Sequence, residues 1–209
     1  IANVNQVPEE RILVGAGLDD VIQIISRSLL SPGDEIIVAD PTFSQYELHA
    51  VIEGAKVVKV PVKQSSGEMD LEAMLEAITA KTKIIWLCNP NNPTGTYLPQ
   101  SLIRAFIEKV PTDVLVISDE AYQEYVTDEA ISTSLPLLET LSNIIVMRTF
   151  SKAYGLAGLR IGYAIIPTTV SRAFDIVRPP FNTSTIAQKA AIVALEDQAF
   201  IEHSVAVNQ

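Results

Sequence analysis

Seven short runs of β-branched and aliphatic residues recur along the chain, and segments with helical spacing separate most of them. Strands that alternate with helices in this way cross over into a largely parallel sheet with helices on both faces. The sequence therefore predicts an α/β fold with three layers, α/β/α, around a mainly parallel seven-stranded sheet. The expected strands span residues 11–15, 34–40, 56–62, 83–88, 113–119, 143–149 and 160–166.

The segments between these runs predict helices. Val21, Ile22, Ile25 and Leu29 share one helical face, and Pro32 and Gly33 then end that helix. The last segment holds neither Gly nor Pro, so we expect one long helix there and a chain that is cut at both ends. With no repeat and no linker, residues 1–209 are expected to form one domain. The expected helices span residues 18–30, 42–53, 70–80, 99–110, 168–178 and 183–209.

Composition excludes several classes of function. The chain carries 25 acidic and 15 basic residues, for a net charge of −10, and no basic block that would follow a nucleic-acid backbone. Its apolar runs are shorter than the roughly 20 residues that a membrane helix needs. The single cysteine, Cys88, rules out an intramolecular disulfide and favours a reducing, cytoplasmic compartment.

In open α/β sheets, ligands bind beyond the carboxyl ends of the strands, so the residues that follow each run are informative. After the first run, the N–H groups of Gly17, Leu18 and Asp19 open a helix and form a candidate phosphate site, although a glycine there is more often only a turn. After the second, Phe43 and Tyr46 offer an aromatic face to a planar ring, unless they are simply core aromatics.

Three further strand ends carry polar side chains. The turn NPNNPTG, residues 89–95, is rich enough in Asn and Pro to hold the amide of Asn92 at a fixed point. Asp119 ends a buried strand, where a carboxylate is costly unless an internal ion pair or a cationic ring nitrogen meets it, and Tyr122 follows closely.

The sixth run leads into RTFSKAYGLAGLR, which places Lys152 at the same sheet edge. Most lysines are solvated and inert, but a lysine among these other groups is a candidate nucleophile. Thr149, Ser151 and Arg160 supply hydroxyls and a cation for an anion beside it. Pyridoxal 5'-phosphate satisfies the whole set, because it combines an aldehyde, a flat ring, a ring nitrogen, a ring oxygen and a phosphate.

The motifs GAGLDD, DPTFSQY, NPNNPTG, SDEAY and RTFSKAYGLAGLRIGY occur in an order and at approximate spacings that identify a family. The chain resembles the fold-type I pyridoxal-phosphate aminotransferases of the aspartate aminotransferase superfamily, and within them the histidinol-phosphate aminotransferases most. The resemblance implies the large, cofactor-binding domain of that fold. It also implies that the family's N-terminal segment and C-terminal small domain are absent from this chain.

The resemblance assigns a role to each candidate residue. It implies that Lys152 forms the Schiff base with the cofactor and moves the substrate's α-proton, and that Asp119 pairs with the ring nitrogen. Asn92 and Tyr122 would bind the ring oxygen, and Phe43 would stack on the ring. The phosphate would be bound by Thr149, Ser151, Arg160, and the Leu18 and Asp19 amides at the turn that Gly17 opens.

The implied reaction is transamination between an amino acid and a 2-oxo acid. The resemblance favours histidinol phosphate and imidazole acetol phosphate with glutamate and 2-oxoglutarate, in histidine biosynthesis, with aromatic amino acids as further substrates. It also implies a homodimer in the cytoplasm, without nucleic-acid or membrane partners. Two alternatives stay open: a decarboxylase similar to the threonine-phosphate decarboxylases, and a non-catalytic domain that senses the cofactor within a transcription regulator.

Overall fold

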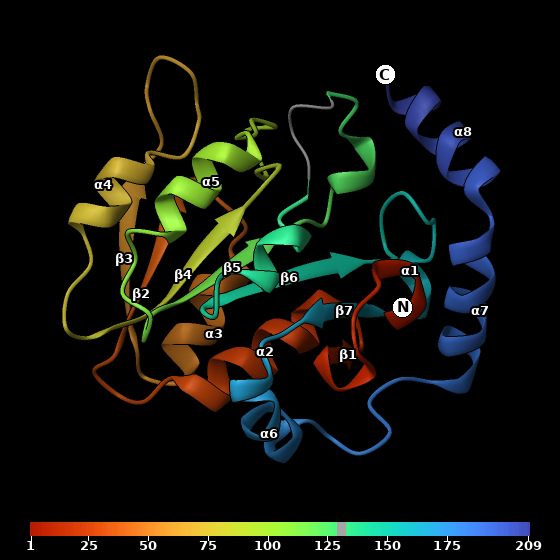
Figure 1. Ribbon diagram of the computed structural model, residues 1–209, viewed down its shortest axis with the longest axis horizontal. Helices are drawn as coiled ribbons and strands as arrows, with labels where there is room; N and C mark the ends of the chain where they lie inside the picture. The colour runs from red at the N-terminus through yellow and green to blue at the C-terminus, as the bar shows by residue number, and fades with distance from the viewer. Residues whose placement is uncertain (129–132) are drawn as a thin grey trace.

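The computed structural model describes residues 1–128 and 133–209, and it confirms the predicted α/β architecture. A seven-stranded sheet in the order β1-β7-β6-β5-β4-β2-β3 forms the middle layer (Figure 1). Each strand lies within one residue of, or inside, a run that the sequence predicts. The strands are β1 Ile12–Gly15, β2 Glu35–Asp40, β3 Lys56–Pro61, β4 Thr82–Cys88, β5 Leu115–Asp119, β6 Ile144–Thr149 and β7 Gly162–Ile165.

Four strand pairings are parallel, and they join β3, β2, β4, β5 and β6 in that order. The exception is β7, which is antiparallel to both of its neighbours, β6 and β1. Its register places Gly162 opposite both Thr149 and Gly15. The carboxyl ends of β1 and β6 therefore meet at the start of β7, so the segments that follow β1 and β6 leave the sheet close together.

Helices cover both faces of the sheet. The α-helices are α1 Ala2–Asn5, α2 Leu18–Leu29, α3 Gln45–Ile52, α4 Leu71–Glu76, α5 Gln100–Ile107, α6 Thr168–Val177, α7 Thr185–Glu196 and α8 Gln198–Asn208. Short 3-10 helices are η1 Glu9–Arg11, η2 Gln123–Tyr125, η3 Leu135–Glu139 and η4 Ala157–Leu159. The N-terminal α1 and the 3-10 helices are additions to the predicted elements.

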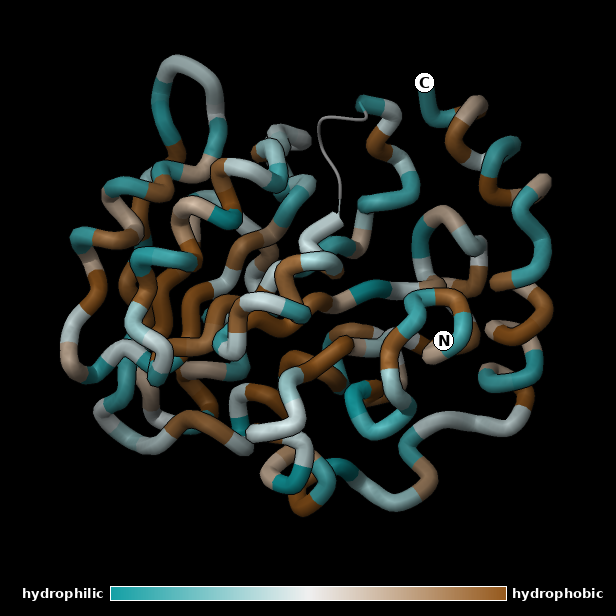
Figure 2. Tube along the Cα trace, in the orientation of Figure 1, coloured by the Kyte–Doolittle hydropathy of each residue, from teal (hydrophilic) through white to brown (hydrophobic). Residues whose placement is uncertain are grey.

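The core consists of two apolar layers separated by the sheet, and Figure 2 shows hydrophobic residues concentrated along the strands. One layer packs the sheet against α2, α3 and α6, with Ile22, Tyr46 and Phe174 fully buried. The other packs it against α4, α5, η3 and α7. Successive strand residues face opposite layers, so neighbouring residues at a strand end have different surroundings.

The single long helix predicted from residue 183 onward is wrong, because the structure divides it at Asp197. The Asp197 carboxylate accepts a hydrogen bond from the N–H of Phe200 at 3.1 Å and caps α8. An aspartate that caps a helix favours a new start rather than continuation. Within the described residues, no helix has both the length and the apolar character needed to cross a bilayer.

Candidate active site

A cavity of about 200 Å³ opens at the carboxyl ends of β4, β5 and β6, beside the start of α2. Every candidate residue from the sequence lines it except Gly17, which adjoins it next to Arg160. The structure thus brings together residues that lie more than a hundred positions apart in the chain. The lining consists of Leu18, Asp19, Phe43, Tyr46, Cys88, Asn92, Asp119, Ala121, Tyr122, Thr149, Ser151, Lys152 and Arg160.

One end of the cavity is suited to an anion. Helix α2 begins here, with Gly17 at its N-cap at φ 84°, and the N–H groups of its first turn have no partners within the helix. A Cβ on Gly17 would lie only 2.4 Å from Nη2 of Arg160, so glycine leaves the space that the guanidinium occupies. This end therefore combines backbone donors, a helix dipole and an arginine.

Arg160 is held in place by three contacts within the chain. Its Nη1 donates to the carbonyl of Ala157 at 2.9 Å and to Oγ of Ser151 at 3.5 Å, and its Nη2 lies 3.6 Å from the Asp19 carboxylate. The side chain of Arg160 is about half exposed, at 48%. The N–H of Ser151 donates to Oγ1 of Thr149 at 3.1 Å, and both residues line the cavity together with Arg160.

Asp119 provides a buried carboxylate in the same cavity, with 3% of its surface exposed. Its Oδ2 accepts from the Tyr46 hydroxyl at 2.6 Å, and its Oδ1 accepts from the Ala121 N–H at 3.0 Å. Burial raises the pKa of Asp119 to about 6, and the hydrogen bonds from Tyr46 and Ala121 work against that rise. Because both of these donors are neutral, a cationic group in the cavity would be a strong partner for Asp119.

Tyr46 and Cys88 are site residues whose roles the sequence did not reveal. Burial, followed by the charge of Asp119, raises the pKa of Tyr46 well above its usual value, so the phenol stays a donor. The same two causes raise the pKa of Cys88 to about 12. Cys88 pairs directly with Asp119 in the register of β4 and β5, a signal that becomes available only with the strand alignment.

The aromatic side chains divide into a buried pair and one that faces the cavity. Tyr46 stacks on Trp86 with ring centroids 4.6 Å apart and an interplanar angle of 10°. Phe43 meets Tyr46 edge-on at 5.6 Å and is only partly buried, so Phe43 offers the surface for a planar ligand. The prediction that Phe43 lies in the first helical turn is wrong, since α3 starts at Gln45.

The turn after β4 explains why three asparagines occur together. The side chain of Asn89 exchanges two hydrogen bonds with the backbone of Leu98, at 3.0 and 2.7 Å. Asn91 accepts from Thr42 at 2.7 Å and donates to the carbonyl of Pro41 at 3.1 Å. These two residues anchor the turn and leave the amide of Asn92 free to face the cavity, where it donates to the Tyr122 hydroxyl at 3.4 Å.

Lys152 lies beside Tyr122, with its Nζ 5.3 Å from the centroid of the tyrosine ring. It follows β6 in a tight segment in which the N–H of Gly155 donates to the carbonyl of Lys152 at 2.9 Å. The amine therefore shares one cavity with the carboxylate of Asp119, the amide of Asn92 and the anion end near Arg160. The individual ligand roles of these residues stay predictions.

Comparison with known proteins identifies the family. The family described as aminotransferase class I and II matches residues 2–209. The chain belongs to this family. It is 55% identical to histidinol-phosphate aminotransferase 1 of Bacillus cereus (strain ATCC 10987 / NRS 248), over 97% of this chain and 54% of that protein. The chain thus spans about half the length of the curated relatives it matches.

Solved aminotransferases share the fold. Histidinol-phosphate aminotransferase from Sinorhizobium meliloti, whose structure is a complex with pyridoxal-5'-phosphate, aligns with a TM-score of 0.90 and 32% identity. That alignment covers 98% of this chain and 55% of the other. L-threonine-O-3-phosphate decarboxylase from Porphyromonas gingivalis aligns with a TM-score of 0.81 and 27% identity, over 96% and 57% of the two chains. The same fold therefore carries more than one reaction.

Proposed function

We propose that residues 1–209 form the large, pyridoxal-phosphate-binding domain of an aminotransferase that acts on histidinol phosphate. One observation carries this proposal. Lys152 and the buried Asp119 share a cavity that also contains the start of α2 and Arg160, which suit an anion. The identity to histidinol-phosphate aminotransferases supports the substrate and a role in histidine biosynthesis.

The donor set of the cavity fits the cofactor group by group. Asp119 would pair with the ring nitrogen, Asn92 and Tyr122 with the ring oxygen, and Phe43 with the ring face. The phosphate would lie at the start of α2. The groups proposed to hold it are Arg160, the hydroxyls of Thr149 and Ser151, and the N–H groups of Leu18 and Asp19 after Gly17.

When bound, the cofactor supplies an aldehyde for bonding to an amine and a ring that withdraws electrons from the substrate's α-carbon. Side chains of this chain would carry out the proton transfers and hold the cofactor ring. As a general base, the Lys152 amine would take the proton from the substrate's α-carbon, and as the conjugate acid it would deliver that proton to the cofactor carbon that carried the aldehyde. The Asp119 carboxylate keeps a proton on the ring nitrogen, and Tyr46 orients that carboxylate from behind.

The proposal includes glutamate and 2-oxoglutarate as the second substrate pair and a cytoplasmic location. The free thiol of Cys88 agrees with a reducing compartment. It also includes a homodimer. Exposed apolar side chains on α3 support an interface, with Leu48 at 51%, Val51 at 58% and Ile52 at 72% exposed.

A half-reaction screen tests the substrate. The intact protein is loaded with pyridoxal phosphate and mixed with single amino donors, and the absorbance change of the bound cofactor is followed in time. We expect histidinol phosphate and glutamate, the two proposed donors, to react faster than phenylalanine or alanine, and to yield oxo products. Equal rates for all donors would refute the substrate assignment while leaving the cofactor assignment in place.

The decarboxylase is the second candidate, supported by the likeness to L-threonine-O-3-phosphate decarboxylase. The same loaded protein is incubated with L-threonine-O-3-phosphate, and released carbon dioxide is measured. Aminotransferase activity predicts no carbon dioxide above that released by Lys152→Ala. Stoichiometric release would replace transamination by decarboxylation as the function.

A further inference from the structure

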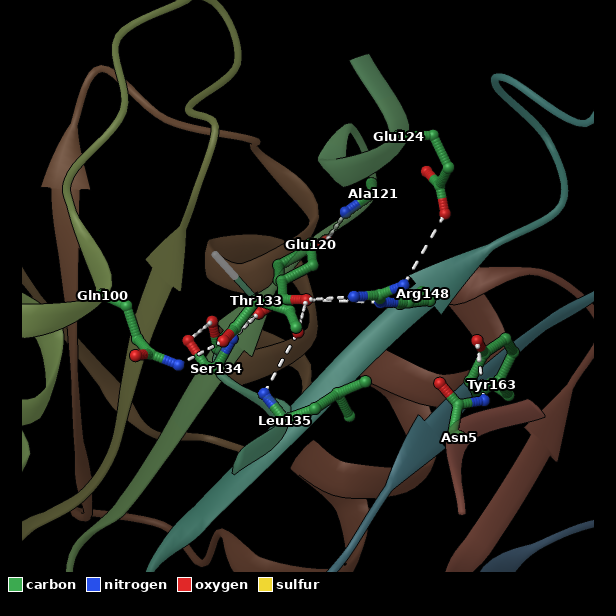
Figure 3. A network of polar contacts seen from close by, with 12 residues as sticks. Asn5, Gln100, Glu120, Ala121, Glu124, Thr133, Ser134, Leu135, Arg148 and Tyr163 are labelled. Atoms are coloured by element: carbon green, nitrogen blue, oxygen red, sulfur yellow. Dashed lines mark hydrogen bonds and ion pairs between the residues drawn. The ribbon is translucent and has the colours of Figure 1, made fainter. Parts of the chain in front are cut away.

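Three charged side chains form a buried cluster next to the cavity but outside its lining: Glu120, Glu124 and Arg148. Figure 3 shows the Arg148 guanidinium between the two carboxylates. Its Nη2 lies 2.9 Å from Oε2 of Glu120, and its Nη1 lies 4.0 Å from Oε1 of Glu124. The side chains are only 2%, 10% and 16% exposed for Glu120, Glu124 and Arg148, so solvent screens them little.

Glu120 ties several segments together. Its Oε2 accepts from Nε of Arg148 at 3.2 Å and from the hydroxyl of Thr133 at 2.6 Å. Its Oε1 accepts from the N–H of Ser134 at 2.6 Å, while its own N–H donates to the carbonyl of Met147 on β6 at 2.9 Å. Glu120 is thus held by both its backbone and its carboxylate.

The position of the cluster in the chain connects it to the site. Glu120 and Glu124 bracket Ala121 and Tyr122, which line the cavity, and both acids reach the same guanidinium. Arg148 directly precedes Thr149, another lining residue. The cluster therefore clamps both ends of the segment that carries Tyr122, and fixes that segment to β6.

Stability alone is a weak reason for such a cluster. Burial raises the pKa of Glu124, and the nearby charge of Arg148 opposes the rise. Removing charges from water is expensive, and apolar residues of similar shape often stabilise a fold as well or better. Directional hydrogen bonds from a planar guanidinium do fix the geometry of the backbone around them. Tyr122 requires this because its hydroxyl lies at the end of a long side chain, so a small backbone shift would displace it.

We propose that Arg148, with Glu120 and Glu124, is a positioning cluster that sets the place of the Tyr122 hydroxyl in the cavity. The inference rests on the proposed cofactor site. Arg148 acts through the segment between the two acids and contacts no ligand. The hydroxyl of Tyr122 then reaches the ring oxygen of the cofactor only while this positioning cluster is intact.

A double-mutant cycle between Arg148→Met and Tyr122→Phe tests the link, with the dissociation constant of pyridoxal phosphate measured by equilibrium dialysis on the intact protein. In the unmodified background, Tyr122→Phe removes one hydrogen bond and is expected to raise this constant about 2- to 10-fold. In the Arg148→Met background, the same change should raise it less than about 1.5-fold, because the hydroxyl is already misplaced.

Arg104→Met is the matched control, since Arg104 pairs with Glu108 on the exposed side of α5 at 3.8 Å. In that background, Tyr122→Phe should keep its full effect. If Arg148→Met does not fold, Glu124→Gln replaces it in the cycle, because it leaves the Arg148–Glu120 pair intact.

The outcomes of the cycle distinguish the positioning role of Arg148 from the proposed cofactor site. If Tyr122→Phe raises the dissociation constant equally in the unmodified protein and in the cluster variant, Arg148→Met or Glu124→Gln, the positioning role is overturned. The proposed function then still stands. An unmodified protein that binds no pyridoxal phosphate would overturn the proposed function and, with it, this inference.

Discussion

Asp119 and Glu120 are neighbours in sequence and both are buried, yet their carboxylates have opposite kinds of partners. Among the described residues, Asp119 accepts hydrogen bonds from a phenol and a backbone amide, which are both neutral. Glu120 is satisfied by a guanidinium at 2.9 Å and by donors from Thr133 and Ser134. The first carboxylate is open to a cationic ligand, and the second already has its counter-ion within the chain.

This contrast follows from the geometry of a strand end. Successive residues face opposite sides of a sheet, so Asp119 faces the cavity and Glu120 faces the ion-pair cluster. The same alternation separates Thr149, which lines the cavity, from Arg148, which does not. We therefore expect substitutions on the cavity side to impair ligand chemistry, and substitutions on the cluster side to impair stability and positioning.

The largest expected effect is on the cavity side. Lys152→Ala removes the proposed proton carrier and should lower transamination at least about 10²- to 10⁴-fold, the usual range for a positioned acid or base. The free energy of unfolding of the ligand-free protein should change by less than about 1 kcal/mol. Steady-state rates and chemical denaturation check both numbers, with exposed Lys109→Ala as the control. Substantial residual activity would remove Lys152 from the chemistry.

A substitution in the ion-pair cluster should instead have its main effect on stability. Glu120→Gln leaves Arg148 without its closest carboxylate and should lower the free energy of unfolding by about 3 kcal/mol, as for other broken buried ion pairs. The matched change in the exposed Arg104–Glu108 pair, Glu108→Gln, should cost less than about 1 kcal/mol. Urea denaturation of the two variants compares them directly. Equal small losses would mean that the buried pair contributes no more than a surface pair.

The free energy of unfolding should depend on pH because folding raises the pKa of Asp119. Its pKa in the folded protein is about 6, against 3.8 for an aspartate carboxyl in the unfolded chain. Between these values the folded state binds more protons, so its stability falls as pH rises from about 4 to 6 and stays lowered above that. The loss is about 3 kcal/mol at most.

Asp119→Asn removes this dependence. The difference in unfolding free energy between the unmodified protein and the variant should therefore change across that pH window in the ligand-free state, and be flat above about pH 7. Denaturant titrations at several pH values measure it. A difference that stays constant from pH 4 to 7 would show that burial does not raise the pKa of Asp119.

The smallest expected effect concerns the donor behind Asp119. Tyr46→Phe removes the 2.6 Å hydrogen bond to Oδ2, and should raise the pKa of Asp119 further by about 1 unit. Carbon-13 NMR of labelled aspartate carboxyls follows that titration. Tyr97→Phe is the control, because Tyr97 is 42% exposed and lies outside the cavity lining. An unchanged Asp119 titration in Tyr46→Phe would remove Tyr46 from the site.

Local patterns were sufficient to predict the strands and the residues at their ends. Each strand run is short, β-branched and bounded by turn residues, so Lys152, Asp119 and Asn92 could be assigned to one sheet edge before their distances were known. The direction of β7 was not predictable in this way, because the apolar pattern of a buried strand is the same in either orientation. The helix break at Asp197 depends on a capping bond that composition does not reveal.

Contacts between distant residues account for what the sequence missed at the site. The Tyr46–Asp119 bond joins residues 73 positions apart, and the Arg148–Glu120 pair joins residues 28 apart. Both depend on the order and register of the strands, which local patterns do not determine. The sequence indicates Tyr46 only as a possible aromatic face, whereas in the structure its hydroxyl donates a hydrogen bond to the Asp119 carboxylate.

The central claim is that Lys152 is the amine that meets the cofactor in this cavity. The intact protein is incubated with pyridoxal phosphate, treated with sodium borohydride to make any bond to an amine permanent, and digested for peptide mass spectrometry. The account predicts one modified peptide, carrying the added mass on Lys152, and no labelling of that position in Lys152→Ala. Label spread over exposed lysines, or no stoichiometric label on Lys152, would contradict it.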